Sequence, residues 1–119
     1  MLNTADTPKV YLAAGSTDLR KSIDGLAALV THSFDLDLFS GRLFVFCNRN
    51  HDKLKILRWD HNGFWLYYRR LERGRFKWPA SSAEQGTLSI DRRQLQWLLD
   101  GLALEQRKAH KPVDARVTV

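Results

Sequence analysis

Hydrophobic and polar positions follow two different periods along this chain, and the change of period separates helices from strands. One helix is predicted over about 18–32, because apolar residues recur there at the spacing of a single helix face: Leu19, Ile23, Leu26 and Val30. A second helix is predicted over about 91–107, where Leu95, Leu98, Leu99 and Leu102 form the apolar stripe. We expect Thr17 to cap the first helix and Asp91, with Gln94, to form a capping box at the second.

Strands are predicted where short apolar runs are bounded by turn residues. Segments 43–47, 53–60 and 64–71 are predicted to form an antiparallel meander, with short strands near 9–13 and 87–90 and a further one at 76–78. Segment 43–47 is apolar throughout, which predicts burial on both faces. Asn62-Gly63 between two strand-like runs predicts a tight hairpin turn, because both residues tolerate positive φ.

These elements predict an α+β fold: a small antiparallel sheet with two amphipathic helices, which we expect on one sheet face. The whole sheet separates the two helices in sequence, so a helix-turn-helix is a poor fit. We expect one domain over 9–108, with a flexible N-terminus at 1–8 and a flexible tail at 109–119.

Composition is that of an ordinary small domain. The chain has 119 residues, of which 44% are hydrophobic, enough for one core without metals or disulfides. No apolar run approaches the roughly 20 residues of a membrane span, and residues 1–8 carry no signal-peptide pattern. The single cysteine, Cys47, lies in the most apolar run, so we expect an inert core thiol. We therefore predict a cytoplasmic protein.

The positive charge is concentrated in one segment. The net charge is +6, and residues 49–77 contain nine basic and three acidic residues, so this segment carries the whole excess. Such a patch attracts polyanions, with nucleic acid the leading candidate and acidic proteins second. We predict these residues as the nucleic-acid-binding set: Arg49, Lys53, Lys55, Arg58, Arg69, Arg70, Arg73, Arg75 and Lys77.

Aromatic residues are interleaved with these cations. Trp59, Trp65, Tyr67 and Tyr68 could stack on bases while the arginines hold phosphates. The alternative is that the aromatics are core residues and the arginines extend from the sheet edges into solvent. We expect at least half of the four aromatics to be core.

Nothing in the chain forms a catalytic or cofactor-binding pattern. His51-Asp52 and Asp60-His61 lie at the two ends of one predicted strand, too far apart to share a metal ion within the hairpin. The remaining carboxylates do not converge as two-metal chemistry requires. We therefore predict no enzyme activity, no metal and no cofactor.

Several motifs, in consistent order over about residues 9–103, resemble one family. They occupy residues 17–21, 23–26, 39–46, 48–49, 53–57, 59–64 and 69–79, the last reading Arg-Arg-Leu-Glu-x-Gly-x-Phe-x-Trp-Pro from Arg69. Together they resemble the TnpB-type accessory protein of the insertion-sequence-66 transposon family, encoded by the second reading frame of these elements. Ser22 is a small departure from the family pattern, where we expect a small residue, often glycine.

The resemblance implies a role in transposition beside a separate, larger transposase that holds the catalytic acids. It carries over no catalytic residue. We therefore expect a non-catalytic accessory protein of DNA transposition that binds DNA through a basic-aromatic β-hairpin surface. The alternative is a protein–protein interaction module that docks on the transposase of the same element.

Overall fold

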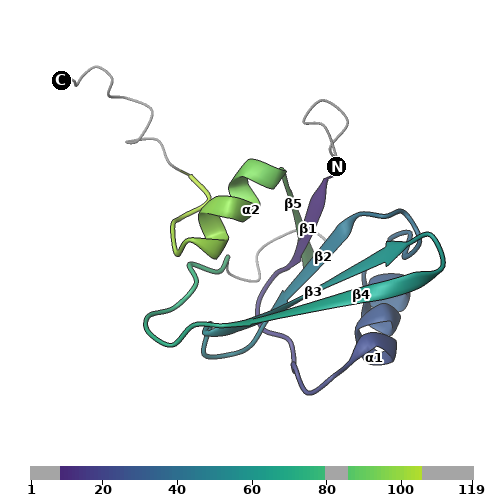
Figure 1. Cartoon of the computed structure of the whole chain (residues 1–119), viewed down its shortest axis with the longest axis horizontal. Helices are drawn as coiled ribbons and strands as arrows, with labels where there is room; N and C mark the ends of the chain where they lie inside the picture. The colour runs from purple at the N-terminus through teal and green to yellow at the C-terminus, as the bar shows by residue number, and fades with distance from the viewer. Residues whose placement is uncertain (1–8, 80–85, 106–119) are drawn as a thin grey trace.

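Five strands form a single mixed sheet at the centre of the molecule. The computed structural model describes residues 9–79 and 86–105. The strands are β1 (Val10–Ala13), β2 (Leu43–Cys47), β3 (Lys53–Asp60), β4 (Gly63–Arg70) and β5 (Thr87–Ile90). Their spatial order is β4-β3-β2-β1-β5 (Figure 1). The α+β prediction is confirmed, with the bounds of β2, β3 and β5 as predicted and those of β1 and β4 within one residue.

The sheet is mixed rather than antiparallel throughout. The meander β2-β3-β4 is antiparallel, as predicted, and β5 pairs antiparallel with β1. However, β1 and β2 are parallel, with Val10 opposite Leu43. Parallel neighbours need a crossover connection, and here the first helix supplies it.

The first helix begins later than predicted. It consists of α1 (Ile23–Ala28), continued by one π-helical turn, η2 (Leu29–Ser33). Thr17 is not its cap, because the Thr17 backbone N–H donates to the Cys47 carbonyl (2.7 Å). The Asp18 side chain accepts from the Arg20 backbone N–H (3.0 Å). Such local side-chain bonds compete with helix formation, so residues 17–20 form a loop.

The second helix ends earlier than predicted. It is α2 (Arg92–Leu99), and the predicted capping box is confirmed: Gln94 N–H donates to the Asp91 side chain (2.8 Å) and the Gln94 side chain accepts from Asp91 N–H (3.0 Å). Gly101 follows with φ +82°, the left-handed conformation that terminates helices. The predicted residues 106 and 107 lie outside the described part of the chain, as do the predicted flexible ends 1–8 and 109–119.

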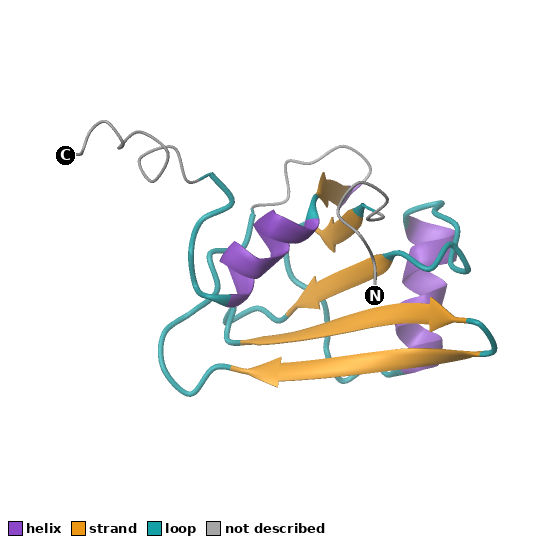
Figure 2. Ribbon diagram, turned by 45° about the horizontal axis from the view of Figure 1, so that its top comes forward, coloured by secondary structure: helices purple, strands orange, loops and turns teal. Residues whose placement is uncertain are grey.

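The two helices pack on opposite faces of the sheet, so the expectation of one shared face is wrong (Figures 1 and 2). Leu95 and Leu98 of α2 join Val45 and Cys47 in one core cluster. Leu26 of α1 joins a second cluster, which includes Phe44 and Phe46. Neighbouring residues of β2 point to opposite faces, and all five are buried. The predicted burial of both faces of this segment is therefore confirmed.

Two local predictions are wrong by small shifts. The β3–β4 hairpin turns at His61 and Asn62, with positive φ at His61 (59°), while Gly63 already pairs with Asp60 in the ladder. Segment 76–78 forms no strand, but a strap without regular structure that packs Phe76 and Trp78 into the core on the α2 face. No helix in the described ranges is long and apolar enough to cross a membrane.

Candidate nucleic-acid interface

The strap over residues 71–79 closes one end of the sheet. Its backbone is tied to the β2–β3 turn, because Leu71 N–H donates to the Asp52 carbonyl (2.8 Å) and Phe76 N–H to the His51 carbonyl (2.7 Å). Farther along, the Trp78 indole N–H donates to the carbonyl of Ala13 (3.0 Å). The strap therefore crosses one end of the sheet, where β1, β2 and β4 end and β3 begins. We call this end of the sheet the basic end.

Alternation along the strap decides which side chains face solvent. Phe76 and Trp78 are buried in the core beneath α2, with 2% and 8% of their surface exposed. Arg75 and Lys77, which alternate with them, are exposed. The burial of Phe76 and Trp78 thus leaves the side chains of Arg75 and Lys77 exposed to solvent.

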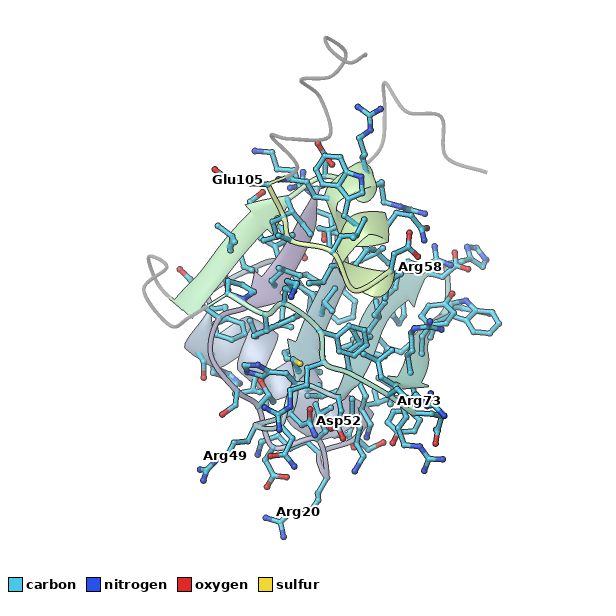
Figure 3. All side chains as sticks on the ribbon, turned by 90° about the vertical axis from the view of Figure 1, so that its left-hand side faces the viewer. Arg20, Arg49, Asp52, Arg58, Arg73 and Glu105 are labelled. Carbon is cyan, nitrogen blue, oxygen red and sulfur yellow. The ribbon has the colours of Figure 1, made fainter. Side chains whose placement is uncertain are left out.

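The basic end brings together most of the predicted binding set. Arg49 lies in the β2–β3 turn, Lys53 opens β3, and Arg70 lies opposite it at the end of β4. The cations that lie at the basic end or on its strap are Arg49, Lys53, Arg69, Arg70, Arg73, Arg75 and Lys77. Figure 3 shows Arg49, Asp52 and Arg73 toward this end, with Arg58 well above them.

Arg58 does not belong to this group. It lies five positions along β3 from Lys53, about 16 Å away at the rise of a strand. Its guanidinium is 3.7 Å from the Asp60 carboxylate, close to the hairpin turn. Of the nine predicted residues, the structure thus places seven at the basic end or on its strap, Arg58 near the hairpin turn, and Lys55 beside the basic end on the α1 face.

Few of the gathered cations are neutralised within the molecule. Arg70 pairs with Glu72 at 2.8 Å, an exposed contact of little stability. Within residues 9–79 and 86–105, these cations of the predicted set have no carboxylate within ion-pair distance: Arg49, Lys53, Lys55, Arg69, Arg73, Arg75 and Lys77.

The acid at the centre of the basic end is engaged by its own turn. The Asn48 amide donates to Asp52 Oδ1 (2.7 Å), and Asn48 Oδ1 accepts from the N–H groups of Asp52 and Lys53. This hydrogen bond, with the nearby charges of Lys53 and Arg75, holds the pKa of Asp52 below its usual value. Asp52 therefore stays ionised and fixes the turn that carries Arg49.

A groove of about 870 Å³ opens beside the basic end, on the face that α1 covers. Lys55 secures one of its margins, because its ammonium donates to the carbonyls of Leu19 (2.7 Å) and Lys21 (2.9 Å). The groove is lined by Ser16, Thr17, Asp18, Leu19, Arg20, Asn48, Arg49, Asn50, Lys53, Lys55 and Tyr68.

Three of the four hairpin aromatics are exposed, so the expectation that at least half are core is wrong. Trp65, Tyr67 and Tyr68 expose 53%, 44% and 56% of their surface, while Trp59 is half-buried. Alternation along β4 puts Tyr68 on the groove side and the other two on the α2 side. Trp65 and Tyr67 stack on each other with ring centroids 6.1 Å apart.

The residues considered for chemistry remain dispersed. His51 and His61 lie at opposite ends of β3, and the described residues contain no group of three His, Cys, Asp or Glu side chains placed to hold a metal ion. Cys47 is buried, as predicted, and burial raises the pKa of its thiol to about 12.

The sequence reading missed the contribution of the loop before α1. Arg20 lines the groove, and its guanidinium donates to both oxygens of Asp18 (2.8–3.2 Å). These contacts hold the pKa of Asp18 well below its usual range. An Asp two residues before an Arg, next to Ser16-Thr17, is a turn pattern that could have been recognised.

Comparison with known proteins agrees with the family resemblance of the sequence over nearly the whole chain. The family model described as IS66 Orf2 like protein matches residues 8–109. The chain is 40% identical over 102 residues to the uncharacterized protein y4hO of Sinorhizobium fredii, covering 86% of this chain and 87% of that protein. It is 31% identical over 105 residues to y4jC of the same organism, covering 88% and 87%. No solved structure matches significantly.

Proposed function

Because this chain belongs to the IS66 Orf2-like family of insertion-sequence proteins, a family of transposition accessory proteins, we propose that it acts by binding DNA without catalysing a reaction. The binding surface is the basic end of the sheet together with the strap. The observation that carries the proposal is the gathering there of cations that have no carboxylate partner in the described structure.

The chemistry of this surface suits a phosphate backbone. Exposed arginines and lysines that are not neutralised internally can each displace a counterion from DNA. The side chains lie on three segments that hydrogen bonds hold together: the β2–β3 turn, the β3–β4 strand ends and the strap. If six phosphates are neutralised, duplex affinity falls about 10³-fold between 50 and 200 mM salt. Phosphate contacts carry no base specificity, and neither helix of the described residues lies at the basic end to add it.

The test compares two triple variants that lose the same charge. The site variant is Arg49→Gln, Lys53→Gln, Arg73→Gln. The control variant is Lys9→Gln, Arg92→Gln, Arg93→Gln. Val10 at the start of β1 pairs with Ile90, so Lys9 and Arg92 lie near the end of β1 that is opposite to the basic end. Fluorescence anisotropy of labelled duplex, titrated at several salt concentrations, gives affinity and salt slope for each protein, with circular dichroism checking the fold.

The site variant should bind more weakly, with a slope of log affinity against log salt reduced by up to about 2.7, since each duplex phosphate contributes about 0.9. The control should retain the slope of the original protein apart from a small change from net charge. Equal losses in the two variants, or a wild-type slope near zero, would reject the proposal.

A second candidate function is docking on the transposase of the same element. The observation that favours it is the stacked pair of Trp65 and Tyr67, exposed on the α2 side of β4, a strand at the sheet edge. Exposed aromatics of this kind anchor protein interfaces. Capture by the transposase that survives nuclease treatment and is lost in Trp65→Ala would support docking. Capture that nuclease abolishes would count against it.

A further inference from the structure

The groove beside the basic end differs from the rest of the positive surface, because an exposed aromatic ring lies among its cations. In the β3–β4 ladder, Tyr68 is directly opposite Lys55, and Lys53 is two positions farther along the same face. Side chains directly opposite in such a ladder have Cβ atoms about 4.5–5.5 Å apart, and diagonal neighbours remain within reach of long side chains. The tyrosine ring and two lysines therefore share one side of the groove.

The charge of the groove is positive after its internal contacts are counted. Four cations line it, Arg20, Arg49, Lys53 and Lys55, and among the described residues that line it the only carboxylate is Asp18. Arg20 engages Asp18 through both oxygens, and Lys55 is bound to the backbone carbonyls of the loop. Arg49 and Lys53 thus remain to meet an anionic ligand.

Tyr68 decides which form of DNA fits this site. The residue is 56% exposed, and an exposed ring beside phosphate-binding cations is the arrangement on which unpaired bases stack. Bases inside a duplex are stacked on their neighbours, so their faces are closed to the ring. The groove volume of about 870 Å³ is within the roughly 300–1,000 Å³ range of small-ligand sites. It matches a short unpaired segment better than the breadth of a duplex.

We infer that this groove binds single-stranded DNA, with one base on the ring of Tyr68 and the flanking phosphates on Arg49 and Lys53. The inference rests on the proposed function and makes it more specific. The basic end meets the duplex backbone, and the groove takes the unpaired strand that continues from it, as at a flap or a branched junction.

The experiment uses the full chain with three DNA probes: a 20-base-pair blunt duplex, a 20-nucleotide oligothymidine strand, and the same duplex with a five-nucleotide single-stranded flap. Tyr68→Ala removes the ring, and Tyr68→Phe retains it without the hydroxyl. The matched control is Phe39→Ala, because Phe39 is similarly exposed (58%) but lies against Trp59 toward the other end of β3. Circular dichroism checks the fold of every variant.

Tyr68→Ala should weaken binding of the oligothymidine strand and of the flap about 5- to 150-fold, the range measured for loss of one stacked base, and leave blunt duplex binding unchanged. Tyr68→Phe and Phe39→Ala should leave all three affinities within about twofold. In addition, an oligothymidine strand carrying 5-iododeoxyuridine should crosslink on irradiation to the peptide that contains Tyr68.

The failure of this inference can be distinguished from failure of the proposed function. If the original protein binds duplex with a salt slope but Tyr68→Ala retains single-strand affinity, the groove assignment is wrong and the DNA-binding proposal stands. If the protein binds none of the three probes even at low salt, both are wrong.

Discussion

Phe76 should be the residue on which the strap depends, and its truncation should affect both stability and DNA binding. The ring is 2% exposed and packs among the residues beneath α2. Its backbone N–H is bound to the His51 carbonyl, so the surrounding structure is poorly placed to collapse into the space left. Phe76→Ala should therefore cost about 3–5 kcal/mol of unfolding free energy, the usual range for a buried phenylalanine. For a domain of this size that is about 12–20 °C in melting temperature.

The matched control is Phe46→Ala, because Phe46 is equally buried (1%) but lies in β2 and faces α1. Urea denaturation should show similar destabilisation for the two variants. Because a domain of this size has only about 5–15 kcal/mol of stability, DNA binding is compared at 15 °C, where circular dichroism checks that both variants are folded. Only Phe76→Ala releases the strap that carries Arg73, Arg75 and Lys77. Its salt slope for duplex binding should therefore fall, by up to about 2.7 for three phosphates, while Phe46→Ala retains the original slope.

Two results would refute this reasoning. A loss of less than about 1 kcal/mol in Phe76→Ala would mean that the ring is not packed as a core residue. Equal salt slopes in the two folded variants would mean that the position of the strap does not matter for DNA binding, and the cations on it would have to be removed from the proposed surface.

Three further predictions concern single positions. Asp91→Ala should lower the unfolding free energy by about 0.5–2 kcal/mol in urea titrations, because it removes the capping box of α2, and Asp91→Asn should restore most of it. His61→Gly should raise the unfolding free energy by about 0.5–1 kcal/mol in the same assay, since φ is +59° in the hairpin turn; a loss would show that the turn is not left-handed there. Burial raises the pKa of the Cys47 thiol from 9.0 to about 12. The stability that the neutral thiol contributes to the folded state is therefore fully present below pH 9 and is lost as pH rises toward 12. Cys47→Ala should remove that part of the alkaline decline, and the native thiol should be unreactive toward Ellman's reagent at pH 8.

The strands could be predicted closely because their signals are local. The apolar run 43–47 and the turn-bounded segment 53–60 were each predicted to the residue. The helices were less predictable, because their ends depend on competing side-chain bonds. Asp18 binds Arg20 instead of leading into a helix, and Gly101 stops α2 although apolar spacing continues to Leu102.

The placement of the helices could have been inferred but was missed. A strand that is apolar at every position needs cover on both faces, and only two helices were predicted to supply it. Phe44 and Val45 point to opposite sides, and each meets a different helix cluster. The parallel pairing of β1 with β2 follows from the same arrangement, since the connection between them carries α1 across one face.

The candidate site was predictable in composition and not in geometry. Charge counting identified the cations, but only the pairing register shows that Lys53 lies beside Arg70 while Arg58 lies near the far turn. The groove was missed because part of one margin, residues 17–20, is predicted as the cap and first turn of a helix. Likewise, the side of β4 that each aromatic occupies depends on the exact register, which a shift of one residue would reverse.

The arrangement of β4 bears on why two functional hypotheses fit one small protein. Its side chains alternate, so Tyr68 faces the cationic groove while Trp65 and Tyr67 face the α2 side of the hairpin. Single-strand binding in the groove and docking on a protein would therefore use different side chains of one strand, so neither activity would exclude the other. Trp65→Ala should then abolish nuclease-resistant capture without changing the salt slope, and the triple variant of the basic end should do the reverse. An accessory protein built this way would hold an unpaired strand and a protein partner on the two faces of a single hairpin.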